Sequence, residues 1–186
     1  MIEDLKKQLE CKNIEYEDYT FRLYGLFSGS VYKRLWIDLP DSWDFKYGSL
    51  LQGKMAEELE TVAPYLVELS FKSEYLDEIL KSYGQNGCVF FCSPLVFDEA
   101  LQRMREVLIV QNKEGMEGYL RFYRPDVFRT LIKKHNIGLL KNMFKQVMYY
   151  YCEEENDPTI LNRYRYDNKS MQFDQFSLKD KEEIKR

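Results

Sequence analysis

Hydrophobic and polar positions alternate along the chain with two periods, which together predict helices mixed with strands. Apolar residues three or four apart predict helices beginning near residues 2, 54, 73, 94, 125 and 136. Continuous or alternating apolar runs predict strands at 19–28, 65–69, 87–92 and, more weakly, 159–176. A β-hairpin is predicted where two such runs flank a polar turn, at 106–111 and 118–123. The predicted fold class is α+β, with a mixed β-sheet flanked by helices.

Prolines and charged runs set the predicted boundaries. Pro64 ends the helix before it, because the residue preceding a proline is pushed away from helical geometry. Ser93 and Pro94 predict a helix start, with the serine as cap and the proline at the first helical position. The acidic run 153–158 marks a change in the composition of the chain and a candidate subdomain edge. We therefore predict one domain, with an α/β core at 1–133 and a smaller, variable C-terminal lobe at 134–186 that ends in a frayed tail.

Composition and charge narrow the classes of function. The 186 residues include 27 Lys and Arg against 31 Asp and Glu, a net charge of −4, which argues against a dedicated binder of phosphate backbones. The N-terminus is charged where a signal peptide would be apolar, and no apolar run approaches the roughly 18 residues of a membrane span. We expect a cytoplasmic protein that binds no membrane. Aromatic residues make up 16% of the chain, a large surface for packing and for contacts.

The residue types that most often act in catalysis or bind metals are scarce in this chain, or they lack the spacing that such sites need. Cys11, Cys88, Cys92 and Cys152 form no CxxC pair, so we interpret them as reduced thiols, with the second and third in a buried strand. There is one histidine, His135, placed for a surface or capping role. No GxSxG, HExxH or Gly-rich phosphate loop occurs. We expect no enzyme activity, no catalytic residues, no metal and no cofactor.

Acidic residues near the middle of the chain also favour a structural interpretation. They lie off the apolar stripe of the helix predicted before Pro64, where charge is the ordinary state of a solvent-facing surface. The charged residues are Glu57, Glu58 and Glu60, and the stripe is Met55, Leu59 and Val62.

Two segments carry arginine and tyrosine together. Residues 162–166 interleave them as single-stranded nucleic-acid surfaces do, although simple alternation favours a strand with packed tyrosines and exposed Arg163 and Arg165. Residues 121–129 place Arg121 and Tyr123 where a strand meets a helix, and Arg and Tyr are the types that most often dominate protein interfaces. A protein-binding role and a small nucleic-acid-associated protein using 162–166 are the two alternatives.

At these segments the chain resembles the type VI secretion effector-chaperone (adaptor) family, once known only as a domain of unknown function. Four segments carry the resemblance in order: Tyr24–Ser30, Val62–Leu69, Ser93-Pro94 and Arg121–Val127. They are similar to the family's opening strand, to its helix end followed by APYLVxL, and to its R-F-Y-D-P-R-V element. Ser28 stands where the family usually has Asp, and Arg124 and Asp126 exchange the usual charges.

The resemblance implies a non-enzymatic adaptor that binds a secreted effector, often near its N-terminal region, and helps load it onto the secretion spike protein. No nucleic-acid partner is implied. We assign partner binding to Arg121, Tyr123, Arg129, Arg163 and Arg165. We assign a structural role to Pro64, Tyr65, Leu66, Ser93, Pro94, Arg124, Pro125 and Asp126, where the reversed charges of the last motif suggest mutual compensation.

Overall fold

The computed structural model describes residues 1–10, 20–32, 45–73, 76–81, 83–111, 114–167 and 170–178. Its elements are α1 (Ile2–Leu9), β1 (Arg22–Ser28), β2 (Tyr47–Ser49), α3 (Gly53–Glu58), β3 (Pro64–Leu69), α4 (Leu76–Leu80), β4 (Cys88–Ser93), α5 (Phe97–Leu108), β5 (Ile109–Gln111), β6 (Glu117–Tyr119), α6 (Pro125–Lys134), α7 (Ile137–Met143), β7 (Tyr149–Glu154), β8 (Asp157–Tyr166) and β9 (Met171–Ser177). None of the helices so described is long and apolar enough to cross a membrane.

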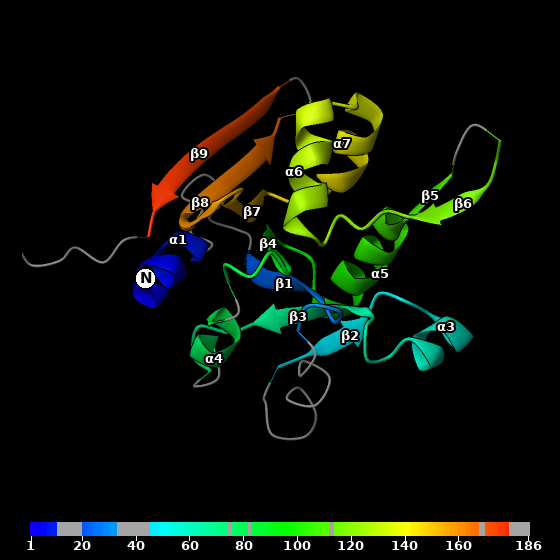
Figure 1. Ribbon diagram of the computed structural model, residues 1–186, viewed down its shortest axis with the longest axis horizontal. Helices are drawn as coiled ribbons and strands as arrows, with labels where there is room; N and C mark the ends of the chain where they lie inside the picture. Colours follow the sequence, from blue (N-terminus) through cyan, green and yellow to red (C-terminus); the bar gives the residue numbers. More distant parts are fainter. Residues whose placement is uncertain are drawn as a thin grey trace, which may run out of the picture.

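One seven-stranded sheet, in the order β2-β3-β1-β4-β7-β8-β9, forms the centre of the molecule (Figure 1). Strands β5 and β6 form a separate two-stranded ribbon that projects from the body (Figure 1). Every strand pair in the described residues is antiparallel, so the α+β class is confirmed but the predicted mixed sheet is wrong. The reason is that the strands are joined by hairpins and by returning helices, and no crossover places two neighbours parallel.

The two faces of the sheet are buried by different helices. Successive side chains of a strand point to opposite faces of the sheet, so Phe90 and Phe91 of β4 pack on opposite sides of it. Phe90 stacks with Tyr83, which follows α4. Phe91 contacts Tyr150, whose hydroxyl donates to the Met143 carbonyl at the end of α7. All of β4 is buried, as its continuous apolar run predicts.

The predicted helix ends agree with the structure only in part. The helix expected to end at Pro64 ends earlier, at Glu58, and α4 ends at Leu80, four residues before Gly84. His135 ends α6 in the left-handed conformation. Asn136 caps α7, its side chain accepting from the Leu139 N–H. The predicted start at Ser93 and Pro94 is wrong, since Ser93 is the last residue of β4 and α5 begins at Phe97.

Ser93 still has a structural role, but in a turn. Its hydroxyl donates to the Gln146 carbonyl over 2.6 Å and accepts from the Leu95 N–H, which ties the end of β4 to the segment before β7. The predicted hairpin is present but shorter, because α5 continues to Leu108 and the second strand ends at Tyr119.

The acidic run 153–158 covers the end of β7, the turn of the β7–β8 hairpin and the start of β8, and both strands continue the sheet beyond β4. The predicted boundary at 133/134 falls within the last turn of α6, which ends at Lys134. Cys88 and Cys152 are free and buried, whereas Cys92 is disulfide-bonded, so the prediction of reduced thiols is wrong for Cys92. Cys11, and residues 179–186 of the predicted frayed tail, lie outside the described residues.

Candidate partner-binding groove

Four segments of the chain meet in one groove, at the end of the molecule where α3 and the β5–β6 ribbon lie (Figure 1). The groove has a volume of about 190 Å³. Its lining comes from the turn after β1, from the stretch between β2 and β3 that includes α3, from the end of α5, and from the stretch between the end of β6 and the start of α6. The lining residues are Ser30, Leu51, Met55, Leu59, Val62, Pro64, Leu108, Tyr119, Arg121, Tyr123 and Arg124.

The apolar stripe before Pro64 faces this groove and is not part of the core. Met55, Leu59 and Val62 are 38%, 40% and 46% exposed. Helix α3 ends at Glu58 and the chain continues as a turn, so the stripe is too short to cover the sheet. The Tyr65 hydroxyl donates to the Glu60 carbonyl over 2.9 Å and holds this turn against β3.

The turn after β1 lies directly against the segment before β3. The Gly29 N–H donates to the Ala63 carbonyl over 3.0 Å. A Cβ on Gly29 would lie 2.5 Å from that same carbonyl oxygen, so this close approach requires glycine. Ser28 is 1% exposed, and its hydroxyl hydrogen-bonds that of Ser30 over 2.8 Å. A neutral pair of hydroxyls therefore occupies the position where the family usually has an aspartate.

The corner before α6 brings Arg121 and Tyr123 to the groove by a route that the sequence did not predict. Residues 121–124 form a turn, not a strand, so Phe122 and Tyr123 are both buried while Arg121 is exposed. The phenol of Tyr123 is 9% exposed and lines the groove. Burial raises the pKa of Tyr123, and the positive charges of Arg121 and Arg124 oppose that rise.

Arg124 and Asp126 form an ion pair across Pro125. Arg124 Nε and Nη2 donate to the two carboxylate oxygens of Asp126 over 3.1 and 2.9 Å, the bidentate arrangement. Partial burial raises the pKa of Asp126, but the hydrogen bonds from Arg124 and from the Val127 N–H outweigh it and lower this pKa below its usual value. The exchanged charges of this motif therefore still meet each other.

This pair is expected to be thermodynamically coupled by about 0.5–1 kcal/mol, since both side chains are partly exposed. A double-mutant cycle of Arg124→Gln and Asp126→Asn, followed by urea unfolding, measures the coupling. Neutral substitutions are needed because Arg124 is the N-cap of α6, where an aspartate would itself cap the helix. Folding lowers the pKa of Asp126, so the coupling should be fully present at pH values above the pKa that Asp126 has in the unfolded chain. The coupling should be lost as pH falls through the lower pKa that Asp126 has in the folded protein. Additive effects at neutral pH would contradict the pairing.

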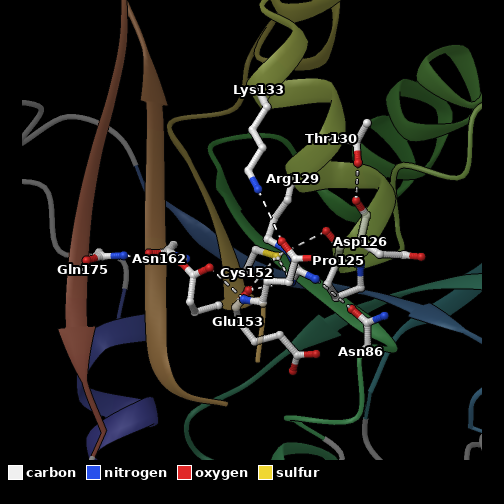
Figure 2. Close-up of polar contacts among 12 residues, drawn as sticks. Asn86, Pro125, Asp126, Arg129, Thr130, Lys133, Cys152, Glu153, Asn162 and Gln175 are labelled. Atoms are coloured by element: carbon white, nitrogen blue, oxygen red, sulfur yellow. Dashed lines mark hydrogen bonds and ion pairs between the residues drawn. The ribbon is translucent and has the colours of Figure 1, made fainter. Parts of the chain in front are cut away.

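Arg129 is 7% exposed and lies inside the molecule, between α6 and β7 (Figure 2). Its Nη1 donates to the Glu153 carbonyl over 2.8 Å and contacts Cys152 Sγ at 3.8 Å, while Nη2 donates to Asn86 Oδ1 over 3.4 Å. A guanidinium held in this way fastens α6 to the C-terminal strands. The structure therefore places Arg129 in the framework behind the groove and not on a partner-facing surface.

The polar groups around Arg129 are buried, and burial affects their protonation. Burial raises the pKa of Cys152 to about 12, which favours the protonated thiol at neutral pH. Burial also raises the pKa of Glu153, against the N–H groups of Gly84 and Asn86, which favour its charged form. Among the described residues, no group of three His, Cys, Asp or Glu side chains is arranged to hold a metal ion.

Arg163 and Arg165 lie on β8, far along the sheet from the groove (Figure 1). Arg163 donates to Asp174 Oδ2 over 2.8 Å and stacks over Tyr149, with 4.7 Å from its guanidinium carbon to the ring centroid. Arg165 lies 6.0 Å from the same ring. The strand interpretation of 162–166 is confirmed, with Tyr164 and Tyr166 packed. Arg163 and Arg165 were predicted to be exposed but are half-buried, and Arg163 is neutralised by an acid of the neighbouring strand. This neutralisation does not favour the nucleic-acid alternative.

The fold and the groove define a small α+β protein that presents an apolar, arginine-bearing recess on an antiparallel sheet. The chain belongs to the family described as Domain of unknown function (DUF4123), whose profile matches residues 23–137. The match begins in β1 and ends at the start of α7, so it includes every groove-lining residue and leaves β7–β9 outside. No curated protein and no solved structure matches the chain.

Proposed function

We propose that this protein is a non-enzymatic adaptor that acts in the cytoplasm, binds a type VI secretion effector and helps load it onto the secretion spike protein. The observation that carries the proposal is the groove. The motif segments Tyr24–Ser30, Val62–Leu69 and Arg121–Val127 each supply part of its lining, although they are separated by many residues in the chain. Membership of the DUF4123 family and the resemblance to effector adaptors support it.

The exposed apolar surface favours protein binding at this end. Twelve large hydrophobic side chains are exposed among the described residues, and half of them belong to α3, the turn after it and the β5–β6 ribbon. Those six are Met55, Leu59, Val62, Ile109, Met116 and Tyr119. Ile109 and Tyr119 lie opposite each other in the ribbon and so share one face. An apolar patch concentrated in this way is typical of a protein interface.

Co-expression with the neighbouring toxin and with spike fragments, followed by size-exclusion chromatography, tests the proposal. The wild-type chain is expected to co-elute with the toxin. Val62→Asp is expected to weaken that complex by at least about tenfold, because it replaces an apolar contact of the stripe by a charged carboxylate that binding must desolvate. Val96→Asp is the matched control, since Val96 is 47% exposed and lies outside the groove.

Two outcomes would count against the proposal. One is that the wild-type chain co-elutes with neither a toxin nor a spike fragment. The other is that Val62→Asp and Val96→Asp bind the toxin equally well, which would remove the groove from the interface. Thermal melting of both variants checks that any loss of binding is not a loss of folding.

A further inference from the structure

The guanidinium of Arg121 lies at the groove, and within the described part of the chain no ion pair or hydrogen bond engages it. Arg124 beside it is neutralised by Asp126. Two other arginines of this protein are also paired with acids: Arg103 with Glu106 over 3.0 Å and Arg163 with Asp174 over 2.8 Å. Arg121 therefore contributes a positive charge that the groove itself does not balance.

The hydroxyl group of Tyr123 is a second polar group at the groove. The Tyr123 phenol lines the groove near enough to Arg121 for the positive charge to act on its pKa. No hydrogen bond engages its hydroxyl among the described residues. A guanidinium and a phenolic O–H are both donors, so together they suit a ligand group that only accepts. A carboxylate is such a group, and an arginine fork matches its two oxygens.

The rest of the groove restricts the kind of molecule that carries this carboxylate. Its other walls are largely aliphatic, from Leu51, Met55, Leu59 and Val62. Its volume of about 190 Å³ is below the ~300–1,000 Å³ of sites that hold drug-sized ligands, and it suits one or two large side chains. A ligand of mixed character and this size is a stretch of polypeptide with apolar side chains next to an acidic one.

We propose that the groove binds a polypeptide segment of the partner through apolar side chains on the Met55–Leu59–Val62 stripe and through one Asp or Glu carboxylate on Arg121 and Tyr123. This inference rests on the proposed function, since it names the feature of the effector that the adaptor recognises. Arg121 is then the residue that determines specificity, and the apolar stripe supplies most of the buried area.

Binding of overlapping synthetic peptides, tiled over the N-terminal region of the co-eluting effector, tests this inference by fluorescence anisotropy. Arg121→Gln is expected to weaken the best peptide by at least about tenfold, the effect of removing a hydrogen bond between charged groups. Replacing the acidic residue of that peptide by its amide should have a similar effect on the wild-type protein and little further effect on Arg121→Gln. Tyr123→Phe should give a smaller loss, and affinity should fall with added salt.

Lys54→Gln is the matched control, because Lys54 lies on α3 outside the groove and is 86% exposed. It should bind the peptide as the wild-type protein does. If Arg121→Gln binds like Lys54→Gln while the effector complex still forms, this inference is overturned and the proposed function stands. If the wild-type chain forms no effector complex, the proposed function fails, and this inference fails with it.

Discussion

Replacing Phe128 by alanine is expected to lower the free energy of unfolding by about 3–5 kcal/mol. Phe128 is fully buried on α6, with its ring centroid 5.1 Å from that of Tyr150 on β7 and 5.5 Å from that of Tyr164 on β8. Its removal leaves a cavity between the helix that carries the Arg124–Asp126 pair and the C-terminal strands. Urea unfolding at a fixed temperature, with the slope compared with that of the wild-type protein, measures the loss.

Phe173→Ala is the matched control for this prediction. Phe173 lies on the edge strand β9 and is 61% exposed, so its truncation should change stability by about 1 kcal/mol or less. Equal losses in the two variants would contradict the packing of α6 on the sheet. A large loss for Phe128→Ala alone, in a single transition with an unchanged urea slope, would indicate that the segment matched by the family profile and the strands outside it unfold together.

The sequence predicts the fold best where one local cause acts alone. The run 87–92 is apolar at nearly every position and becomes the fully buried strand β4. Asn136 caps α7 because its side chain reaches an N–H three residues ahead, a contact that depends only on local sequence. Pro64 begins β3 for an equally local reason, although the helix that it was expected to end stops earlier, at Glu58.

Where a local signal competes with a partner that is distant in the sequence, sequence alone misses the outcome. Ser93 and Pro94 carry a strong signal for a helix start, but the Ser93 hydroxyl finds the Gln146 carbonyl, a partner 53 residues away. Strand β4 consequently continues through Ser93. The strand predicted to reach Tyr123 ends early for a related reason, because Phe122 and Tyr123 turn inward together and their rings meet edge to face.

The candidate site was partly predicted, and the missing part has a physical explanation. Arg121 and Tyr123 were assigned to partner binding, and the structure places both at the groove. The apolar stripe of Met55, Leu59 and Val62 was interpreted as core, because helical periodicity does not reveal which surface a stripe will face. The only signal available was length, since Pro64 leaves room for little more than one turn beyond α3.

For Arg129 the error is the reverse: a residue predicted to bind a partner at the surface is buried in the structure. Its position next to the arginine-rich corner suggested an exposed anchor, but helical spacing turns it toward β7, where it meets the carbonyl of Glu153. A carbonyl acceptor cannot be located from sequence, because every residue of the chain carries one. Buried arginines held by backbone carbonyls therefore resemble surface arginines until the fold is known.

Leu66→Ala is expected to lower the free energy of unfolding by about 2–5 kcal/mol while leaving the affinity of the folded protein for its partner unchanged. Leu66 is fully buried on β3 and lies beside Leu26 of β1, which is in turn opposite Val89 of β4. Its truncation therefore opens a cavity at the centre of the sheet, and Leu66 is not one of the residues that line the groove.

Val62→Ala, four residues earlier, is expected to give the reverse result. Val62 is 46% exposed and lines the groove, so its truncation should change stability by about 0.5 kcal/mol or less and should weaken partner binding. Urea unfolding gives the first quantity for both variants, and titration of the partner at a temperature where both are folded gives the second. A Leu66→Ala variant that unfolds like the wild-type protein but loses its partner would show that β3 belongs to the interface. Because the two residues belong to one motif, opposite responses of the two variants would separate the part of Val62–Leu69 that builds the sheet from the part that contacts the partner.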